Sequence, residues 1–282
     1  MNFHGGKEDM GTYRMSSENI KRITSGIVIV LMIIGGILAG GVFWLLVTAA
    51  IASVSLWEYY ILLESNAHLS KGIGIIGSLI LFLVTYRGLF YLSVGPLLAV
   101  FAFIILLTEI LRRHLTGESN ALWNLGGTLS GLILVSLPWI FIFHLRTFPR
   151  GLYFLLTLFL CTWACDVCAY IVGTKWGEKH LSEKVSPNKT WEGFIGGLCG
   201  SLLGGALVSY ILSLHPLPFI LIGCICGIAG QMGDLAESLL KRESGVKDSS
   251  DIIPGHGGFF DRFDSILISG TLTYLVFGVI IG

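Results

Sequence analysis

The chain alternates long apolar runs with short polar segments. A helix needs about 20 apolar residues to cross the hydrocarbon core of a membrane. From Ile23 to Trp57 there is no charged residue, and this stretch is long enough for two such helices with Gly40-Gly41 as the break between them. The same pattern continues to the carboxyl end and predicts nine membrane spans. They lie near 23–39, 43–63, 72–86, 89–111, 122–143, 151–173, 194–212, 217–239 and 265–282.

The basic residues give these spans an orientation, because loops on the cytoplasmic side carry an excess of Lys and Arg. With the amino end in the cytoplasm, only Arg87, Arg146 and Arg150 of the 18 Lys and Arg residues fall outside. An even number of spans would spoil this asymmetry. We therefore expect an all-α, polytopic integral membrane protein of about nine transmembrane helices, with its amino end cytoplasmic.

This pattern divides the chain into three regions. Residues 1–22 form a polar cytoplasmic tail, either disordered or a short interfacial helix. Residues 23–150 hold five spans, and residues 151–282 hold four spans with cytoplasmic loops at 174–192 and 240–264. The first apolar run is too long for a signal peptide and lacks a convincing cleavage site, so an uncleaved first helix is expected.

Glycines recur at four-residue spacing in the later spans, which lets helix backbones approach closely in lipid. The sets are Gly193/Gly197, Gly196/Gly200/Gly204 and Gly223/Gly227. We interpret them as packing positions.

Composition supports the membrane class, since 54% of the residues are hydrophobic and the mean hydropathy is +0.79. The net charge of zero gives no reason to expect a nucleic acid partner. All six cysteines fall inside apolar runs, so we expect small buried side chains and neither a disulfide framework nor a zinc site.

Acidic residues inside membrane spans are costly, by at least about 2.5–3.5 kcal/mol for an ionised side chain at the bilayer centre, and they usually mark function. Five occur here, each toward the cytoplasmic end of its span: Glu58, Glu109, Asp166, Asp234 and Glu237. The first two lie near enough to the interface to snorkel or to pair with Arg112 or Arg113. We interpret Asp166 and Asp234 as functional.

The stretch Ser238–Asp264 carries nine charged residues among its 27, although the whole chain is only 13% charged. Helical spacing places Asp234, Glu237 and Lys241 on one face, and Asp261 and Asp264 on another. Converging carboxylates suit a hard divalent cation such as Mg²⁺, which commonly takes one or two carboxylates plus substrate phosphates. A solvated loop whose charges pair among themselves is the alternative reading.

Cations and backbone turns accompany these acids on the same side. The cations are Lys184, Lys189, Lys241, Arg242, Lys247 and Arg262. Ser186–Thr190 and Pro254–Gly258 are interpreted as turns whose N–H groups can reach phosphate oxygens, and His256 as a phosphate donor or a turn anchor. Carboxylates, bases and turns together are typical of phosphoryl-type transfer, although the Walker P-loop motif is missing from the sequence.

Three motifs resemble the CDP-diacylglycerol synthases, also called phosphatidate cytidylyltransferases. The longest reads Ser238-x-Leu-Lys-Arg, then Lys247-Asp248 after four residues, then Pro254-x-His-Gly-Gly-Phe-x-Asp-Arg-Phe-Asp264. Upstream stand Asp166-x-x-Ala-Tyr-x-x-Gly173 and Ser186-Pro-x-Lys-Thr-Trp-Glu-Gly193. The likeness is sharp over about 164–265, whereas the first 150 residues share only their run of apolar spans.

The resemblance implies an enzyme of phospholipid biosynthesis that joins CTP to phosphatidic acid, giving CDP-diacylglycerol and pyrophosphate. It implies Mg²⁺, with a second cation such as K⁺ as an option, and a homodimer in the bacterial inner membrane with its site facing the cytoplasm. Carried over by motif, the catalytic residues would be Asp234, Lys241, Asp261, Arg262 and Asp264, with the three aspartates as metal ligands. The residues expected at the substrates and their phosphates are Asp166, Ser186, Lys189, Ser238, Arg242, Lys247, Asp248, His256, Gly257 and Gly258.

Other functions remain as alternatives at this stage. A cation-coupled transporter also uses intramembrane acids, but it predicts acids spread through the membrane depth and paired, interrupted halves. The CDP-alcohol phosphotransferases need an Asp-Gly…Ala-Arg motif, and neither dipeptide occurs here. A polyprenol or phytol kinase is the nearer alternative.

Overall fold

The computed structural model describes residues 17–64, 68–246, 249–250 and 257–281. Within these residues the chain forms nine helical rods at the positions of the nine predicted spans, and two of the rods contain a π-helical turn. The helices are α1 (Ser17–Ala39), α2 (Gly41–Leu63), α3 (Lys71–Tyr86), α4 (Phe90–Thr116), α5 (Ala121–Gly131), α6 (Leu137–Leu145), α7 (Gly151–Trp176), α8 (Trp191–Leu212), α9 (Pro216–Ile225), α10 (Gln231–Glu243) and α11 (Phe260–Ile281). The π turn η1 (Leu132–Ser136) joins α5 to α6, and η2 (Cys226–Gly230) joins α9 to α10.

Six of these rods are long and apolar enough to cross a membrane, so the chain is an all-helical integral membrane protein. They are Gly41–Leu63, Ser93–Thr116, Ala121–Leu145, Gly151–Trp176, Trp191–Leu212 and Pro216–Glu243. Two shorter apolar helices, Thr24–Ala39 and Lys71–Tyr86, accompany them. In α11 three charged residues, Asp261, Arg262 and Asp264, precede the apolar part of the helix.

The helix boundaries follow from local chemistry at several points. Gly40 and Gly41 have φ angles of +64° and +50°, which side chains with a Cβ rarely adopt, and the predicted break between the first two spans lies there. Arg146 donates from Nε to the carbonyl oxygen of Ile37 at 2.9 Å, so it caps the end of α1. The first helix begins at Ser17, earlier than predicted, because the polar residues before Ile23 continue its turns.

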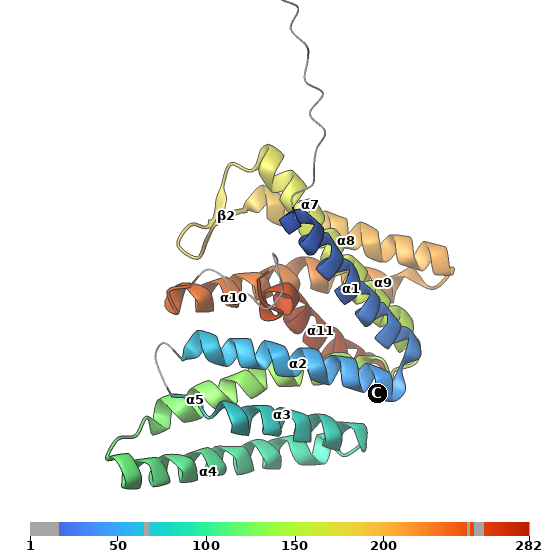
Figure 1. Ribbon diagram of the computed structural model, residues 1–282. Helices are drawn as coiled ribbons and strands as arrows, with labels where there is room; N and C mark the ends of the chain where they lie inside the picture. Colours follow the sequence, from blue (N-terminus) through green and yellow to red (C-terminus); the bar gives the residue numbers. More distant parts are fainter. Residues whose placement is uncertain (1–16, 65–67, 247–248, 251–256, 282) are drawn as a thin grey trace, which may run out of the picture.

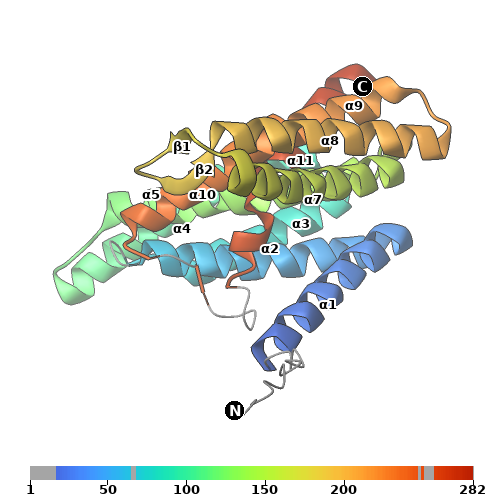
Figure 2. The ribbon, with the colours of Figure 1, turned by 90° about the horizontal axis from the view of Figure 1, so that it is seen from above.

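The rods stack in layers with α11 near the middle (Figures 1 and 2). One side holds α1, α7 and α8, the next layer holds α9, α10 and α11, and beyond α2 come α3, α5 and α4 (Figure 1). The core lies between α2, α6 and α11, where Trp139 and Phe263 meet edge to face with ring centroids 5.1 Å apart. This packing fixes the first turn of α11 against the first five rods.

The predicted glycine packing is confirmed along α7, α8 and α9. A Cβ atom added at Gly200 would lie 2.5 Å from the Sγ atom of Cys168, and one at Gly223 would lie 2.5 Å from the carbonyl oxygen of Ser201. The backbones are therefore too close for any larger residue. All six cysteines are free thiols, and Cys161, Cys165 and Cys226 are buried as predicted. Cys168 and Cys224 are only partly buried and Cys199 is exposed, so the prediction of burial is wrong for these three.

The segment between α7 and α8 corrects the sequence-based prediction. Ser186–Thr190 was predicted as a turn, but it forms strand β2, which pairs antiparallel with β1 (His180–Ser182). Thr190 then caps α8 by accepting a hydrogen bond from the N–H of Gly193 at 3.1 Å. Proline and β-branched residues suit an exposed edge strand as well as a turn, and this ambiguity hid the hairpin.

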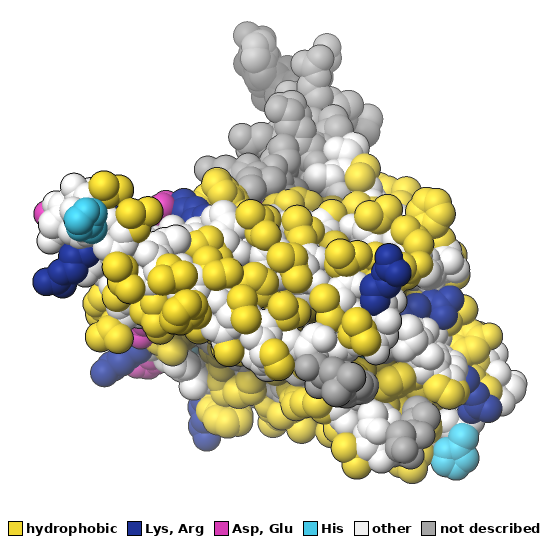
Figure 3. All heavy atoms as spheres, turned by 90° about the horizontal axis from the view of Figure 1, so that it is seen from below, with side chains coloured by type: hydrophobic (Ala, Val, Ile, Leu, Met, Phe, Trp, Pro, Cys, Tyr) yellow, Lys and Arg dark blue, Asp and Glu magenta, His cyan; other side chains and the backbone are white. Residues whose placement is uncertain are grey.

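The predicted loops are also shorter than expected. Helix α7 continues to Trp176, α10 continues to Glu243, and α11 already begins at Phe260. The surface agrees with a lipid environment: hydrophobic side chains cover the middle of the face in Figure 3, and Lys and Arg side chains lie toward its two ends. Helix α4 likewise exposes apolar side chains, among them Phe103 and Leu107.

Candidate active site

A cavity of about 1020 Å³ opens where α1, α7, the β hairpin, α10 and α11 meet. Its lining combines two kinds of surface. Apolar residues of α1 and α7, among them Ile29, Ile33 and Trp163, form one wall. The rest of the lining is mainly polar and includes Asp166, Ser186, Lys189, Asp234, Glu237, Lys241, Asp261, Arg262 and Asp264. The three motifs therefore contribute side chains to one space.

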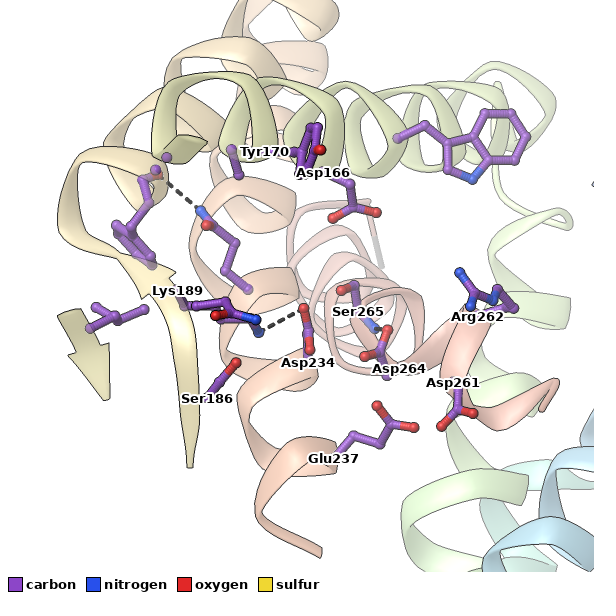
Figure 4. A pocket seen from close by; sticks show the side chains of 18 of the residues that line it. Asp166, Tyr170, Ser186, Lys189, Asp234, Glu237, Asp261, Arg262, Asp264 and Ser265 are labelled. Carbon is purple, nitrogen blue, oxygen red and sulfur yellow. Dashed lines mark hydrogen bonds and ion pairs between the residues drawn. The ribbon is translucent and has the colours of Figure 1, made fainter. Parts of the chain in front are cut away.

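Three carboxylates form a compact cluster in this cavity. One oxygen from each of Asp234, Glu237 and Asp264 lies within 4.8 Å of the others. Among the described residues, these three form the one group of acidic, His or Cys side chains spaced closely enough to hold a metal ion. Asp234 and Glu237 share a face of α10 at i, i+3, and Asp264 comes from the first turns of α11. Figure 4 shows these side chains and Asp166 of α7 directed into the same space.

The donor set of this cluster fits a hard divalent cation. Glu237 is 3% exposed, and its Oε1 atom has no hydrogen-bond donor among the described residues. A buried carboxylate oxygen without a donor, beside two further carboxylates, needs a positive charge or a proton to offset the repulsion. Oxygen-only ligands of this kind are the ones that Mg²⁺ prefers. Asp234, Glu237 and Asp264 are thus the residues that could hold it.

Two lysines neutralise part of this negative charge. Lys189 reaches from β2 and places Nζ 2.6 Å from Oδ2 of Asp234 (Figure 4). Lys241 of α10 lies between two acids, 3.0 Å from Glu237 and 3.1 Å from Asp261. Arg262 lines the same cavity from α11. Acids and bases that are far apart in the sequence thus line one cavity.

Asp261, which the motif predicts as a metal ligand, lies outside the compact carboxylate cluster. Its carboxylate accepts hydrogen bonds from the N–H groups of Gly258 at 3.0 Å and Ser249 at 3.0 Å, besides its contact with Lys241. Burial raises the pKa of Asp261, but the hydrogen bonds from the Gly258 and Ser249 N–H groups and the Lys241 charge outweigh this and lower it to about 2. Asp261 is therefore ionised and held by these partners, whereas Glu237 belongs to the compact cluster with Asp234 and Asp264. Which of these carboxylates bind a metal stays a prediction.

Other predicted substrate residues are divided between the cavity and its supports. The N–H of Gly258 is used to hold Asp261, and Gly257 adopts a positive φ of +80°. Ser238 donates to Oδ1 of Asp234 at 3.5 Å, and Arg242 donates from Nε to the carbonyl oxygen of Val185 at 3.2 Å. The last contact ties α10 to the hairpin. Lys247, Asp248 and His256 lie outside the described residues, so their roles stay predictions.

The two outlying membrane acids behave differently from each other. Glu109 pairs with Arg112 at 3.2 Å, as one reading of the sequence expected, and accepts hydrogen bonds from Asn120 and Asn124. Glu58 does neither of the expected things: it is fully buried, and it accepts from the Ser250 hydroxyl and the Phe260 N–H. Glu58 therefore neither snorkels nor pairs with Arg112 or Arg113, because Ser250 and Phe260 bind its carboxylate inside the protein.

Two residues of the site were not assigned a role from the sequence. Glu237 was recognised as a membrane acid on the same helix face as Asp234, but it was not predicted to be a ligand. Its i, i+3 spacing from Asp234 was the signal that could have placed it among the ligands. Gln231 lines the cavity and donates from Nε2 to the carbonyl oxygens of Phe194 and Gly227, at 3.0 and 2.6 Å. It secures the π turn before α10, and a lone glutamine in an apolar run gives no such signal.

Comparison with known proteins agrees with this site. The model of the cytidylyltransferase family matches residues 20–280. A phosphatidate cytidylyltransferase of Bacillus subtilis is 32% identical over 265 residues, which cover 91% of this chain and 96% of that protein. Proteins of the same name from Synechocystis and Staphylococcus aureus are 44% and 46% identical over 133 and 129 residues. Those two matches span about half of each protein, 45% and 50% of the relatives and 46% and 45% of this chain.

Proposed function

The chain belongs to the cytidylyltransferase family, and we propose that it catalyses the reaction of CTP with phosphatidic acid to give CDP-diacylglycerol and pyrophosphate. The observation that carries this proposal is the cavity in which a carboxylate cluster, two lysines and an arginine face an apolar wall. Such a space accommodates both a nucleoside triphosphate and the head group of a lipid.

The chemistry asks little of the protein in proton transfer. The nucleophile is an oxygen of the phosphate monoester of phosphatidic acid, whose second ionisation lies near pH 6, as in phosphorylated side chains. It attacks the α-phosphorus of CTP, a new P–O bond forms, and the bond to the bridging oxygen breaks as pyrophosphate leaves with its electron pair. A strong general base is unnecessary, so catalysis reduces to aligning two anions and offsetting their charge.

The residues of the cavity divide these tasks between them. Asp234, Glu237 and Asp264 would hold Mg²⁺. When bound, this ion would supply positive charge that offsets the negative charge of the reacting phosphates. Lys189 and Arg262 line the cavity as cations for the triphosphate and for the lipid phosphate. Lys241 keeps Glu237 and Asp261 in place by contacting both carboxylates. In this scheme no residue forms a covalent bond with a substrate.

The wall of α1 supports a lipid substrate. Ile29, Val30 and Ile33 line the cavity from α1, and Trp163 lines it from α7. Acyl chains can remain in this apolar part while the phosphate reaches the carboxylate cluster. CTP, which carries four negative charges when fully ionised, enters from the polar side formed by the β hairpin and α10.

We further propose nine spans in the bacterial inner membrane, with the amino end and the site facing the cytoplasm. Arg146 contacts Ile37 near the α1–α2 junction, and α7 runs from that end toward Asp166 at the site, which supports the orientation given by the basic residues. A homodimer follows from the resemblance of the three motifs. In a cysteine-free background, Arg150→Cys should be labelled from outside and Lys184→Cys from inside by an impermeant thiol reagent. The reverse pattern would contradict the orientation.

The experiment that tests the proposed reaction uses purified protein in detergent. With labelled CTP, phosphatidic acid and Mg²⁺ it should form labelled CDP-diacylglycerol, and omission of either substrate should abolish the product. Replacement of phosphatidic acid by diacylglycerol serves as the control, because it lacks the attacking phosphate. If size-exclusion chromatography shows that the protein is folded and the protein still yields no product, the proposal is contradicted.

A further inference from the structure

Glu58 is an acidic residue in the membrane-embedded part of α2, far along the chain from the three motifs. Its side chain is fully buried, and both carboxylate oxygens are used. Oε1 accepts a hydrogen bond from the hydroxyl of Ser250 at 2.5 Å, and Oε2 accepts one from the N–H of Phe260 at 2.7 Å. Ser250 lies in the segment that joins α10 to α11, and Phe260 is the first residue of α11. Glu58 therefore holds that segment from the opposite half of the protein.

The contact with Phe260 has a specific consequence for α11. Phe260 is the first residue of this helix, and the N–H groups of a first helical turn have no acceptor within the helix. A carboxylate at this position satisfies one of them and interacts favourably with the positive end of the helix dipole. The acceptor is supplied by another helix instead of by a residue just before α11. Tyr59 adds an edge-to-face contact with the Phe260 ring, at 5.6 Å between centroids.

The glycine pair of the longest motif fits against the same carboxylate. A Cβ atom at Gly258 would lie 2.7 Å from Oε2 of Glu58 and 2.0 Å from the hydroxyl of Ser249. Only glycine leaves room for the connector to pass over Glu58 at this point. The N–H groups of Gly258 and Ser249 then hold Asp261, and Asp261 contacts Lys241 of α10. An unbroken set of contacts thus leads from Glu58 to the carboxylate cluster.

We propose that Glu58 is a positioning residue for the active site, which sets the start of α11 and thereby the placement of Asp261, Arg262 and Asp264 against α10. The first five rods would then supply a component of the site in addition to their membrane anchoring. The effect on catalysis rests on the proposed cytidylyltransferase function, whereas the anchoring of α11 does not. Residues that orient ligands in this indirect way typically cost about 10–100-fold in activity or metal affinity when they are lost.

The test compares three changes at this contact with a matched control. Glu58→Leu keeps the volume and removes both hydrogen bonds, Glu58→Gln keeps an acceptor and loses the charge, and Ser250→Ala removes the partner of Oε1 while the partner of Oε2 stays. Glu109→Leu is the control, because Glu109 is also a buried glutamate of the first five rods, at 3% exposure, but it contacts Arg112, Asn120 and Asn124. Each variant is purified as the full chain, and only folded protein is measured.

The first measurement is hydrogen exchange, which does not depend on activity. We expect faster exchange in peptides covering 257–264 for Glu58→Leu, a smaller effect for Glu58→Gln and Ser250→Ala, and no change there for Glu109→Leu. The second is the rate with CTP and phosphatidic acid. We expect Glu58→Leu to lower kcat by about 10–100-fold and to raise the Mg²⁺ concentration for half-maximal rate, with KM for CTP changed far less.

Each outcome decides the proposal. Unchanged exchange at 257–264 together with unchanged kinetics in Glu58→Leu would overturn it. If Glu58→Leu does not fold, the pair Glu58→Gln and Ser250→Ala decides in the same way. If exchange rises locally but the wild-type protein has no cytidylyltransferase activity, the anchoring of α11 stands and the proposed function is wrong. If Glu109→Leu raises hydrogen exchange at 257–264 as much as Glu58→Leu does, Glu58 contributes only to general stability. That result would contradict a positioning role.

Discussion

Lys189 places its Nζ atom 2.6 Å from the carboxylate of Asp234, although Lys189 belongs to the middle motif and Asp234 lies on another element, outside the three motifs. The contact joins β2 of the hairpin to α10 and closes one side of the cavity (Figure 4). Asp234 therefore has a cation beside it. A triphosphate entering the cavity would compete with Asp234 for this lysine.

Lys189 should therefore contribute chiefly to nucleotide binding. We expect Lys189→Met to raise KM for CTP by about 10–100-fold, because a hydrogen bond to a charged group contributes roughly 1.5–3 kcal/mol. Lys184→Met is the control on the same hairpin, since Lys184 is exposed and does not line the cavity. Steady-state kinetics with varied CTP measure the effect. Equal KM values in the two variants would argue against a phosphate role for Lys189.

Asp264 is expected to be indispensable for turnover. Asp264→Asn keeps the shape of the side chain but removes one negative charge from the cluster with Asp234 and Glu237. We expect a loss of about 10²-fold or more in kcat, comparable to removal of a main electrostatic group from an active site. The oligomeric state by size-exclusion chromatography should stay as in the wild type. Activity within a few-fold of the wild type would show that Asp264 is not a metal ligand.

Glu237 provides the sharpest test of the carboxylate cluster, because the family motif points to Asp261 and the geometry points to Glu237. We expect Glu237→Gln to raise the Mg²⁺ concentration for half-maximal rate by about tenfold or more. Glu243→Gln on the same helix should leave it unchanged, because Glu243 is exposed and does not line the cavity. Magnesium titrations of the initial rate give the comparison. A Glu237→Gln variant with normal magnesium dependence would return the ligand role to Asp261.

The sequence predicted most of the architecture because apolar length is a strong signal in a membrane protein. The break at Gly40-Gly41 and the close packing at Gly200 and Gly223 follow from residues whose chemistry leaves few options. The hairpin of β1 and β2 was missed, because a short polar strand such as Ser186–Thr190 has no hydrophobic alternation. The apolar pattern also gave no reason to separate a π turn from an ordinary helix at Cys226–Gly230.

The sequence predicted which residues line the site better than it predicted which of them contact one another. Helical spacing placed Asp234 and Glu237 on one face, but it could not show which carboxylates of α11 would meet them. That choice depends on how the connector folds, and the N–H groups of Gly258 and Ser249 draw Asp261 away from the cluster. The hydrogen-bond partners of Glu58 were harder still to predict, because they follow it in the sequence by about 200 residues. Contacts over such separations arise only from the packing of whole helices.

The close contact at Gly223 predicts a change in stability. Its added Cβ would stand 2.5 Å from the Ser201 carbonyl oxygen, so Gly223→Ala must push α9 away from α8. We expect a loss of about 1–3 kcal/mol in the free energy of unfolding, as for other overpacked cores. Gly35→Ala is the control, because nothing lies within 4 Å of its added Cβ. Thermal unfolding in detergent should show a lower Tm for Gly223→Ala alone, and equal Tm values would contradict the packing.

The position of the transferred phosphorus tests the central claim most directly. CTP labelled with ³²P at the α-phosphate and, separately, at the γ-phosphate is given to the folded protein with phosphatidic acid and Mg²⁺. Attack at the α-phosphorus predicts that the α label enters the lipid product and that the γ label leaves as pyrophosphate. A lipid kinase would transfer the γ label and release CDP. Appearance of the γ label in lipid, or of no label in lipid, would contradict cytidylyl transfer by this protein.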